Sequence, residues 1–228
     1  IANTNLAYAN SQVTQRVVLV HSQLVNYDET NFDFSTTLQR LRDGQIAGVQ
    51  TLRHDYKADL VVMVVKGSGQ YCGIGYVMTS NFVQDPPKPG WDFAYAAYSL
   101  VAVNCLGGFT TAHEMGHNLG ATHDWANSGV SGAYLYSHGY HIYPASGNVC
   151  YYTVMAYFCT NRTYRYEIPY FSNPNVNYAG LPTGVAGGTQ PANNALTFNN
   201  TARIAARFRD GVGPTAPSAP VVNRISQT

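Results

Sequence analysis

The sequence predicts an α/β fold built around a mostly parallel sheet. In the first hundred residues, segments with helical spacing of apolar residues alternate with apolar runs of strand length, an order typical of parallel strands joined by helices. One run, residues 59–65, is apolar almost throughout, as expected for a strand buried on both faces. A chain of 228 residues, 45% of them hydrophobic, is long enough for one domain with a substantial core.

The elements before this run are expected in the following order. Residues 1–13 show a weak helical pattern, and the valine-rich residues 16–21 favour a strand. A helix opens at residues 36–42 and is interrupted at Gly44. Residues 45–56 then place apolar side chains at helical spacing, which would lay one face of this helix on the sheet.

Shorter elements are expected after the buried strand. Residues 73–78 form a predicted strand whose glycines suit the close approach of another group. Residues 84–91 are a proline-rich loop, and residues 97–103 are the last strand with a clear pattern.

The second half of the chain is predicted to be less regular. Gly, Tyr, Ser and Asn dominate to about residue 190, and helical spacing returns over residues 193–209. We therefore expect one domain over residues 1–212, divided at residues 123 and 124 into an N-terminal part and an irregular C-terminal part that ends in a helix. Residues 213–228 have the composition of a linker or a tail.

Charge and composition exclude several classes of partner. The formal net charge is +1 and no basic run exists, which argues against nucleic acid and anionic membranes. No apolar stretch is long enough to span a bilayer. Only 11% of residues are charged, which suits a secreted protein, and a start at Ile1 favours removal of a signal and a pro-segment. A monomer is expected.

One segment carries the pattern H-E-x-x-H-x-x-G-x-x-H. On a helix, His113 and His117 leave the same face one turn apart, with Glu114 beside them. Gly120 can end the helix with a positive φ and turn the chain, which brings His123 back as a third ligand. Three protein ligands leave one position of a zinc ion open for water, as in catalytic sites.

In a chain of this composition, the probability that these five fixed positions arise by chance is on the order of 1 in 100,000. The alternative is a degenerate site that binds metal without catalysis. The other histidines, His21, His54, His138 and His141, have no partner at metal spacing, and we interpret them as ordinary surface or core residues.

Four cysteines allow three pairings, and none forms a C-x-x-C metal pair. With zinc assigned to histidines, two disulfides in an oxidising compartment are expected, Cys72 with Cys105 and Cys150 with Cys159. The alternative is four buried free thiols.

The segment Thr153-Val154-Met155-Ala156-Tyr157 follows the histidine motif by about thirty residues. With that motif, the chain resembles the metzincin clan of zinc endopeptidases, in which a methionine-containing turn lies beneath three histidines. The resemblance implies an α+β domain whose twisted, mostly parallel sheet has one antiparallel edge strand. It assigns roles to five matching residues: the zinc ligands His113, His117 and His123, the general base Glu114, and the turn residue Met155.

Two further positions relate the chain to branches of the clan. Asp124, directly after the third histidine, is similar to the adamalysin or reprolysin branch. Tyr157 is similar to astacins and serralysins, which makes it a candidate fifth ligand and oxyanion stabiliser; the alternative is a packed aromatic residue. The combination is closest to bacterial secreted reprolysin-like enzymes, including peptidyl-Asp metalloendopeptidases. Those relatives begin with another strand, which this sequence lacks.

The resemblance implies hydrolysis of internal peptide bonds by a zinc-activated water, with Glu114 as general base. An extended protein or peptide substrate would pair with the edge strand at Gly73, Ile74, Gly75 and Tyr76. As a hypothesis, Arg162 or Arg165 pairs with an acidic residue just after the scissile bond; the alternative is that both are solvated surface residues.

Two alternatives to a metzincin-like endopeptidase remain at the level of the sequence. A gluzincin-like enzyme would use Glu167 as third ligand in place of His123. A catalytically inactive interaction module of the same fold would keep zinc only as a structural ion. Calcium is carried by several relatives, but no D-x-D-x-D-G loop supports it here.

Overall fold

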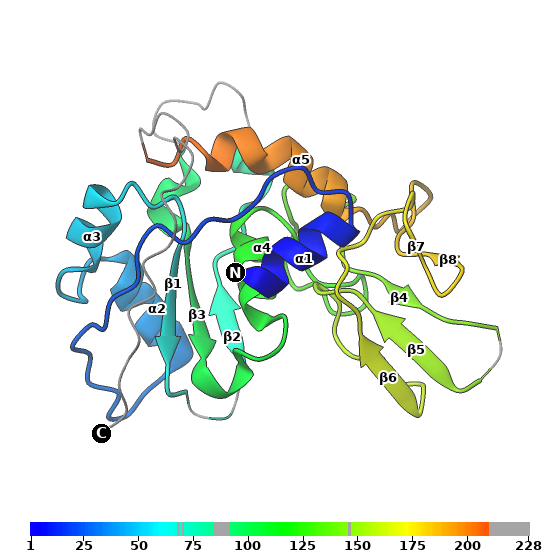
Figure 1. Ribbon diagram of the computed structural model, residues 1–228, viewed down its shortest axis with the longest axis horizontal. Coiled ribbons are helices and arrows are strands. Elements are labelled where there is room, and N and C mark those ends of the chain that lie inside the picture. The colour runs from blue at the N-terminus through cyan, green and yellow to red at the C-terminus, as the bar shows by residue number, and fades with distance from the viewer. Residues whose placement is uncertain (68, 70, 84–91, 146, 210–228) are drawn as a thin grey trace.

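The computed structural model describes residues 1–67, 69, 71–83, 92–145 and 147–209. Its main sheet has the order β1-β3-β2 (Figure 1), formed by β1 (Val61–Val65), β2 (Gly73–Gly75) and β3 (Tyr98–Ala102). Strands β1 and β3 are parallel, and β2 is antiparallel to β3. The predicted fold class, a mostly parallel sheet with one antiparallel edge strand, is confirmed.

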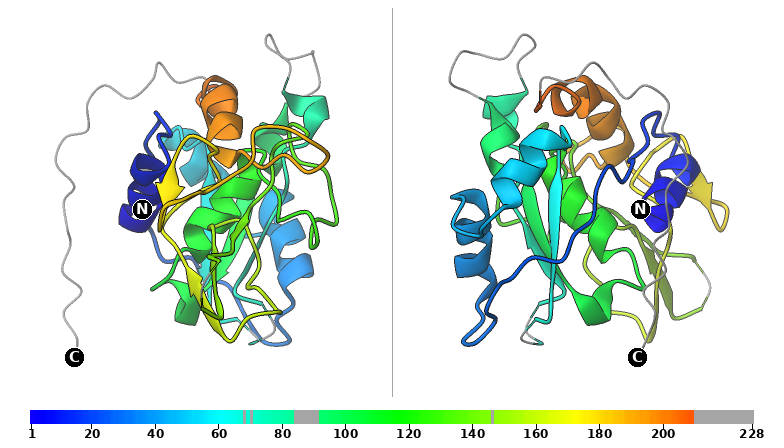
Figure 2. Two further views of the ribbon diagram at one scale, coloured as in Figure 1. Left: turned by 90° about the vertical axis from the view of Figure 1, so that its right-hand side faces the viewer. Right: turned by 60° about the vertical axis from the view of Figure 1, so that its left-hand side comes forward.

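Helices cover both faces of this sheet (Figures 1 and 2). On one face lie α2 (Phe34–Arg42) and α3 (Val49–Asp55), which pack on the first hydrophobic core. On the other face lies α4 (Thr110–Asn118), flanked by α1 (Ala2–Asn10) and α5 (Asn194–Ala205). In the described part of the chain, no helix is both long and apolar enough to cross a membrane.

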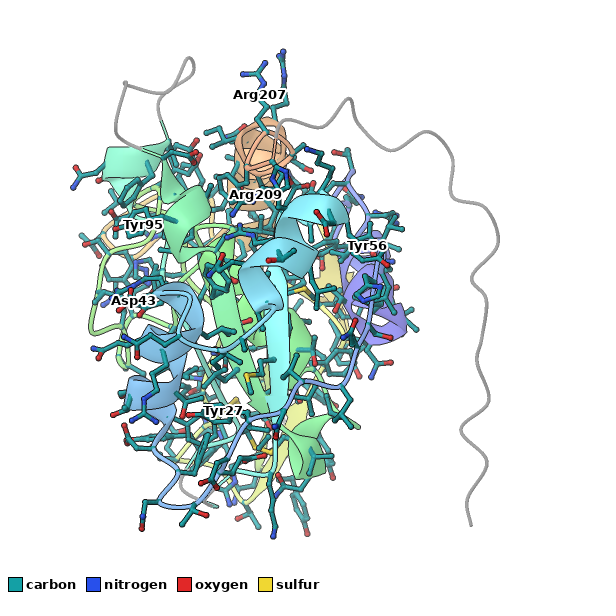
Figure 3. All side chains as sticks on the ribbon, turned by 90° about the vertical axis from the view of Figure 1, so that its left-hand side faces the viewer. Tyr27, Asp43, Tyr56, Tyr95, Arg207 and Arg209 are labelled. Atoms are coloured by element: carbon teal, nitrogen blue, oxygen red, sulfur yellow. A yellow bond between two sulfur atoms is a disulfide. The ribbon has the colours of Figure 1, made fainter. Side chains whose placement is uncertain are left out.

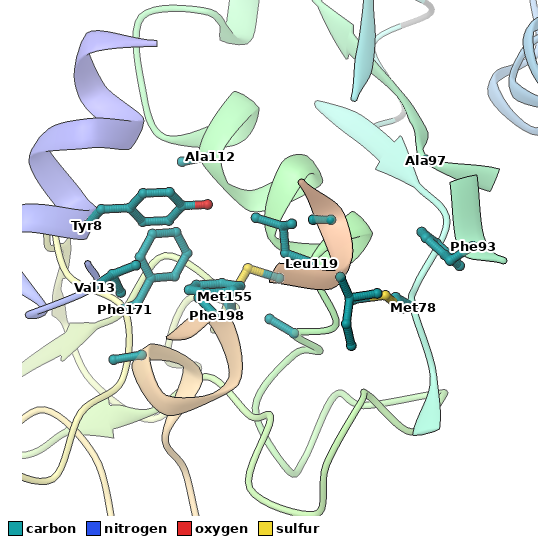
Figure 4. Close-up of a cluster of buried hydrophobic side chains, with 14 of the residues drawn as sticks. Tyr8, Val13, Met78, Phe93, Ala97, Ala112, Leu119, Met155, Phe171 and Phe198 are labelled. Atoms are coloured by element: carbon teal, nitrogen blue, oxygen red, sulfur yellow. The ribbon is translucent and has the colours of Figure 1, made fainter. Parts of the chain in front are cut away.

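The second core joins segments that are far apart in the sequence. Tyr8 of α1 lies with its ring centroid 5.3 Å from Phe171, and Phe171 lies 4.7 Å from Phe198 of α5. Met155 packs among these rings and is fully buried (Figure 4). The core therefore fixes the methionine turn beneath α4.

The C-terminal part contains short strands separated by irregular segments. One small sheet has the order β4-β5-β6, with β4 (His141–Ile142), β5 (Val149–Tyr152) and β6 (Tyr164–Glu167); β7 (Asn177–Tyr178) pairs with β8 (Leu181–Pro182). Single turns of 3-10 helix lie at η1 (Ser80–Phe82), η2 (Phe93–Ala96) and η3 (Val103–Cys105). The predicted closing helix is α5.

Both expected disulfides are present. Cys72 pairs with Cys105 at a Cα–Cα distance of 5.6 Å and ties the start of β2 to η3. Cys150 pairs with Cys159 at 6.4 Å and ties β5 to the segment after Met155.

The strand predicted at residues 16–21 is wrong, because this segment has no regular secondary structure. A strand needs a partner for its backbone groups, and no described strand pairs with this segment. Val18, Leu19 and Val20 are 40%, 61% and 47% exposed. The segment is held instead by Asn5, whose side chain bonds the backbone N–H and C=O of Val17, both at 2.8 Å.

Two boundaries and the burial of one strand also differ from the prediction. The helix expected over residues 45–56 begins only at Val49, because Gly48 has a φ of +82° and breaks the helical path. Strand β1 is not buried on both faces, since Val64 is 48% exposed and the described sheet ends at β1. Strand β2 ends at Gly75, three residues earlier than predicted. The loop 84–91 and the tail 213–228 lie outside the described residues.

Behind the sheet, a buried arginine joins α3 to the strands. Arg53 is 2% exposed, donates to the carbonyl oxygens of Ala58 at 3.0 Å and Ala94 at 2.7 Å, and lies over the ring of Tyr98. Burial lowers the pKa of Arg53. Figure 3 shows this side of the molecule, with Arg209 at the end of α5. Helix α3 is therefore anchored by Arg53 on the side of the sheet away from the C-terminal strands.

Candidate metal centre

The end of α4 turns the chain back on itself. The N–H of Ala121 donates to the carbonyl oxygen of Gly116 at 2.9 Å, and the N–H of Gly120 donates to that of His117 at 3.0 Å. These two bonds, with a φ of +93° at Gly120, form a Schellman motif. Gly120 therefore has the predicted role, and the reversal brings His123 beside the helix.

Three imidazoles converge at this point. The Nε2 atom of His123 lies 3.1 Å from Nε2 of His113 and 3.1 Å from Nε2 of His117. Nitrogens bound at 2.0–2.1 Å to a tetrahedral zinc ion would lie about 3.3 Å apart. The three ligand atoms are therefore spaced as a single zinc ion requires.

Hydrogen bonds on the far side of two of the rings fix their tautomers. Nδ1 of His113 donates to the carbonyl oxygen of Val154 at 2.7 Å, and Nδ1 of His117 donates to that of Ala121 at 3.0 Å. His123 is bonded to the backbone of Asn127. Because carbonyl oxygens only accept, Nδ1 carries the proton in His113 and in His117, and Nε2 of each presents its lone pair to the centre.

Burial also keeps these rings neutral. It lowers the pKa of His113 to about 4, with a further contribution from His123, and it holds the pKa of His117 well below its usual range. Buried ring nitrogens that converge with their lone pairs are unfavourable unless a cation binds. The residues present therefore fit a zinc ion.

No second cluster of metal ligands occurs among residues 1–67, 69, 71–83, 92–145 and 147–209. The one group of three or more His, Cys, Asp or Glu side chains with converging ligand atoms is His113, His117 and His123. Glu167 is not part of it, so the gluzincin-like alternative is wrong. Acidic residues form no such group in this part of the chain.

Glu114 lies beside the three histidines and is 5% exposed. Its side chain contacts strand β2, since Cβ atoms built on Gly73 and Gly75 would lie 2.6 Å from Oε1 and 3.3 Å from Oε2. Burial raises the pKa of Glu114 to about 8. The carboxyl group therefore binds a proton much more strongly than an ordinary glutamate does.

The turn at Met155 lies directly beneath α4. A Cβ atom on Gly116 would lie 2.6 Å from the sulfur of Met155, so only glycine permits this contact. The backbone of the turn also contacts Gly139, where a Cβ atom would lie 2.5 Å from the nitrogen of Ala156. The structure thus places Met155 where the resemblance expected it.

Asp124 links the third histidine to this turn. Its Oδ2 accepts from the N–H of Tyr157 at 3.0 Å, and its Oδ1 accepts from the side chain of Asn127 at 2.9 Å. The ring of Tyr157 lies 4.3 Å from that of His123 and is 46% exposed. Burial, Glu114 and Asp124 raise the pKa of Tyr157.

Two histidines that were interpreted as ordinary contact the site. Nδ1 of His138 donates to the carbonyl oxygen of His123 at 2.9 Å, and its ring stacks on Trp125 at 3.9 Å. Nε2 of His141 donates to the carbonyl oxygen of Tyr157 at 2.7 Å. Both bonds are to backbone atoms, and no spacing in the sequence signals such bonds.

The two candidate arginines have different surroundings. The guanidinium group of Arg165 lies 5.1 Å from the ring of Phe158, directly after Tyr157, and donates to the carbonyl oxygen of Cys159 at 3.4 Å. Arg162 lies 5.1 Å from the ring of Tyr143. Arg165 therefore contacts the residue that follows Tyr157, whereas Arg162 contacts the residue that follows β4.

Strand register places Arg165 on the face of the small sheet that carries His141. Arg165 pairs with Cys150, Glu167 with Tyr152, and Tyr152 with His141. Paired residues share a face, as do alternate residues of a strand. Because His141 contacts Tyr157, this face is the one turned toward the histidines.

Together, the fold and the site define a class: mixed α/β proteins with a three-histidine metal centre above a methionine turn. A family model described as "Metallo-peptidase family M12B Reprolysin-like" matches residues 1–124, more than half of the chain. The chain belongs to this family, and the predicted resemblance to reprolysin-like proteins is confirmed.

Individual relatives agree with this assignment. The chain is 34% identical over 212 residues to a "Peptidyl-Asp metalloendopeptidase" of Stenotrophomonas maltophilia (strain K279a), covering 92% of this chain and 46% of that protein. It is 29% identical over 203 residues to a protein of the same name from Pseudomonas fragi, covering 89% of this chain and 98% of that protein. The chain thus spans less than half the length of the first relative.

A solved structure shows the same fold. It is titled "Structure of a chaperone-substrate complex" and is 18% identical in sequence, with a TM-score of 0.56 over 90% of this chain and 29% of that chain. At this identity, the likeness concerns the fold alone.

Proposed function

We propose that this protein is a secreted zinc endopeptidase that hydrolyses internal peptide bonds of proteins. The observation that carries the proposal is the convergence of three Nε2 atoms, 3.1 Å apart in two pairs, beside the buried carboxyl of Glu114. The names of the relatives support the same activity.

When bound, zinc would act as a Lewis acid toward water and the scissile carbonyl group. Glu114 would accept a proton from the attacking water and deliver it to the nitrogen of the leaving amine as the C–N bond breaks. A pKa raised by burial suits this role, because the group must bind the proton before it releases it. Tyr157, next to His123, would donate from its hydroxyl group to the developing oxyanion.

An extended substrate would bind by pairing with the open edge of β2. This strand pairs with β3 on one side, and no other described strand pairs with it. Pairing through backbone groups would hold many sequences in the same orientation. The edge strand thereby positions the scissile bond next to Glu114.

Preference for an acidic residue just after the scissile bond is part of the proposal. The relatives are named for aspartate. Arg165 shares the histidine-facing side of the small sheet, and within the described part of the chain no carboxylate forms an ion pair with it. A guanidinium group at this place, bonded to a carbonyl oxygen and not to a described carboxylate, would attract a carboxylate of the substrate.

The covalent structure supports an oxidising compartment. All four cysteines form disulfides, a state that persists outside the reducing cytosol. This supports secretion.

The proposal is tested by hydrolysis of an unfolded protein of known sequence. The zinc-loaded protein, the chelator-treated protein and the variant Glu114→Gln are compared, with Glu29→Gln as a matched control away from the site. We expect cleavage only by the zinc-loaded protein and the control, with mass spectrometry placing acidic residues after the cuts.

Two other results would reject the proposal. Cleavage by Glu114→Gln at the rate of the unchanged protein would contradict the role of Glu114. Absence of cleavage by every form, with zinc bound, would favour the inactive interaction module.

A further inference from the structure

Gly73 and Gly75 of β2 lie against Glu114 with no space for a side chain. A Cβ atom on Gly73 would lie 2.6 Å from Oε1 and 2.7 Å from Cγ of Glu114, and 2.8 Å from the carbonyl oxygen of Leu100. A Cβ atom on Gly75 would lie 2.9 Å from the carbonyl oxygen of Glu114. All four distances are shorter than the contact distances that Cβ atoms adopt in proteins.

Backbone conformation does not explain these two glycines. Neither residue has a φ in the left-handed region, so other residues could adopt the same backbone. What requires glycine is the contact with α4. The sequence had suggested that something approaches these residues closely, and the structure identifies it as Glu114.

The same two residues face the open edge of the sheet. The backbone carbonyl oxygen of Cys72 accepts from the N–H of Ala102 at 2.8 Å, and the N–H of Tyr76 donates to the carbonyl oxygen of Tyr98 at 3.4 Å. These backbone groups of Cys72 and Tyr76 therefore point toward β3. Alternate residues of an antiparallel strand direct their backbone groups to opposite sides. The N–H and C=O groups of Gly73 and Gly75 therefore point away from β3, where a substrate strand would pair.

We propose that Gly73 and Gly75 are positioning residues for Glu114: their lack of side chains seats the carboxyl group directly beneath the backbone that binds substrate. The inference rests on the proposed function of Glu114 as general base. It gives the edge strand two roles, since the atoms that orient the substrate and the atoms that locate the base belong to the same two residues.

The first test uses metal-free protein and needs no activity. Urea unfolding midpoints are compared for the unchanged chain, Gly73→Ala, Glu114→Ala and the double variant. We expect Gly73→Ala to lower the midpoint clearly, and by less when Glu114 is already alanine, because the overlap with Cγ and Oε1 is gone. Gly187→Ala, where no atom lies within 4 Å, is the control and should leave the midpoint unchanged.

Gly75→Ala provides an internal contrast. Its closest contact is with the backbone oxygen of Glu114, which Glu114→Ala does not remove. We therefore expect Gly75→Ala to lower the midpoint by similar amounts in both backgrounds. An equal drop for Gly73→Ala in both backgrounds, or failure to fold in both, would assign Gly73 to its contact with Leu100 and overturn the proposal.

The second test measures peptidase kinetics in zinc-loaded protein. Displacing the carboxyl group by a fraction of an ångström should lower kcat about 10- to 100-fold in Gly73→Ala while zinc content and KM stay nearly unchanged. A kcat within twofold of the Gly187→Ala control would overturn the proposal. If the unchanged protein shows no activity, the proposed function fails, and the unfolding comparison still reports whether Gly73 and Glu114 are in contact.

Discussion

Asp124 and Tyr157 are joined by a hydrogen bond of 3.0 Å from the backbone N–H of the tyrosine to Oδ2 of the aspartate. In the sequence, Asp124 follows the third histidine and Tyr157 follows the methionine turn, so this bond joins two segments of the metal centre. On its other side, Tyr157 is held by His141 through its carbonyl oxygen at 2.7 Å. The turn is therefore fixed by two side-chain bonds, one from Asp124 and one from His141 of β4.

Replacing Asp124 by alanine should destabilise both the fold and the site. The change leaves the N–H of Tyr157 and the side chain of Asn127 without their acceptor, at a cost of about 2–4 kcal/mol in the free energy of unfolding. Zinc affinity should fall as well, because His123 directly precedes the change. Urea unfolding and zinc titration measure both effects, with the exposed Asp55→Ala as control. Equal stability of the two variants would show that the Asp124 bonds are not important.

Gly116→Ala should destabilise the protein although alanine favours helices. The new methyl group would lie 2.6 Å from the sulfur of Met155, in a core without free space. Overpacking of this kind costs about 1–3 kcal/mol, more than the gain in helix propensity of about 1 kcal/mol. Thermal and urea unfolding measure the difference from Gly187→Ala. A variant as stable as that control would refute the close packing of the turn on α4.

The stability of the metal-free protein should depend on the ionisation of Glu114. Burial raises the pKa of this group from 4.5 in the unfolded chain to about 8. A raised pKa means that the folded state binds the proton more tightly, so the favourable contribution is present below pH 4.5 and is lost as pH rises from 4.5 to 8.

Glu114→Gln removes this loss. Its stability relative to the unchanged protein should increase from pH 5 to pH 7, by up to about 3 kcal/mol at pH 7. The histidines are the same in both proteins, so their titration cancels in the difference. Urea unfolding with a chelator present measures it. A difference that does not change with pH would mean that Glu114 is not buried in the folded metal-free protein.

Arg165→Gln should reduce cleavage before acidic residues by at least about tenfold, an effect of one charge-assisted contact. Arg162→Gln should change this cleavage little, because Arg162 lies over Tyr143, whereas Arg165 lies over Phe158, the residue after Tyr157. Paired peptides with aspartate or asparagine after the scissile bond give the preference as a ratio of kcat/KM. An unchanged ratio in Arg165→Gln would remove this residue from the account of specificity.

The histidine motif could be predicted because its geometry is local. His113 and His117 are one helical turn apart, and Gly120 ends the helix within one more turn, so spacing alone brings His123 to the same point. Disulfide pairing and the position of Met155 were also predicted correctly.

Features that depend on distant partners could not be predicted. Residues 16–21 have the composition of a strand, but composition does not supply a neighbouring strand. The bonds of His138 and His141 are made to backbone oxygens of His123 and Tyr157, which any sequence would present. The contact of Gly73 with Glu114 joins residues 41 positions apart on different elements.

The metal centre itself is tested most directly by zinc stoichiometry together with X-ray absorption at the zinc edge. The account predicts one zinc ion per chain, bound by three imidazole nitrogens at about 2.0–2.1 Å and by one oxygen of water. Replacing any one of His113, His117 and His123 by alanine should abolish this spectrum. A fourth protein ligand on the ion, or a chain that binds no zinc, would contradict the account.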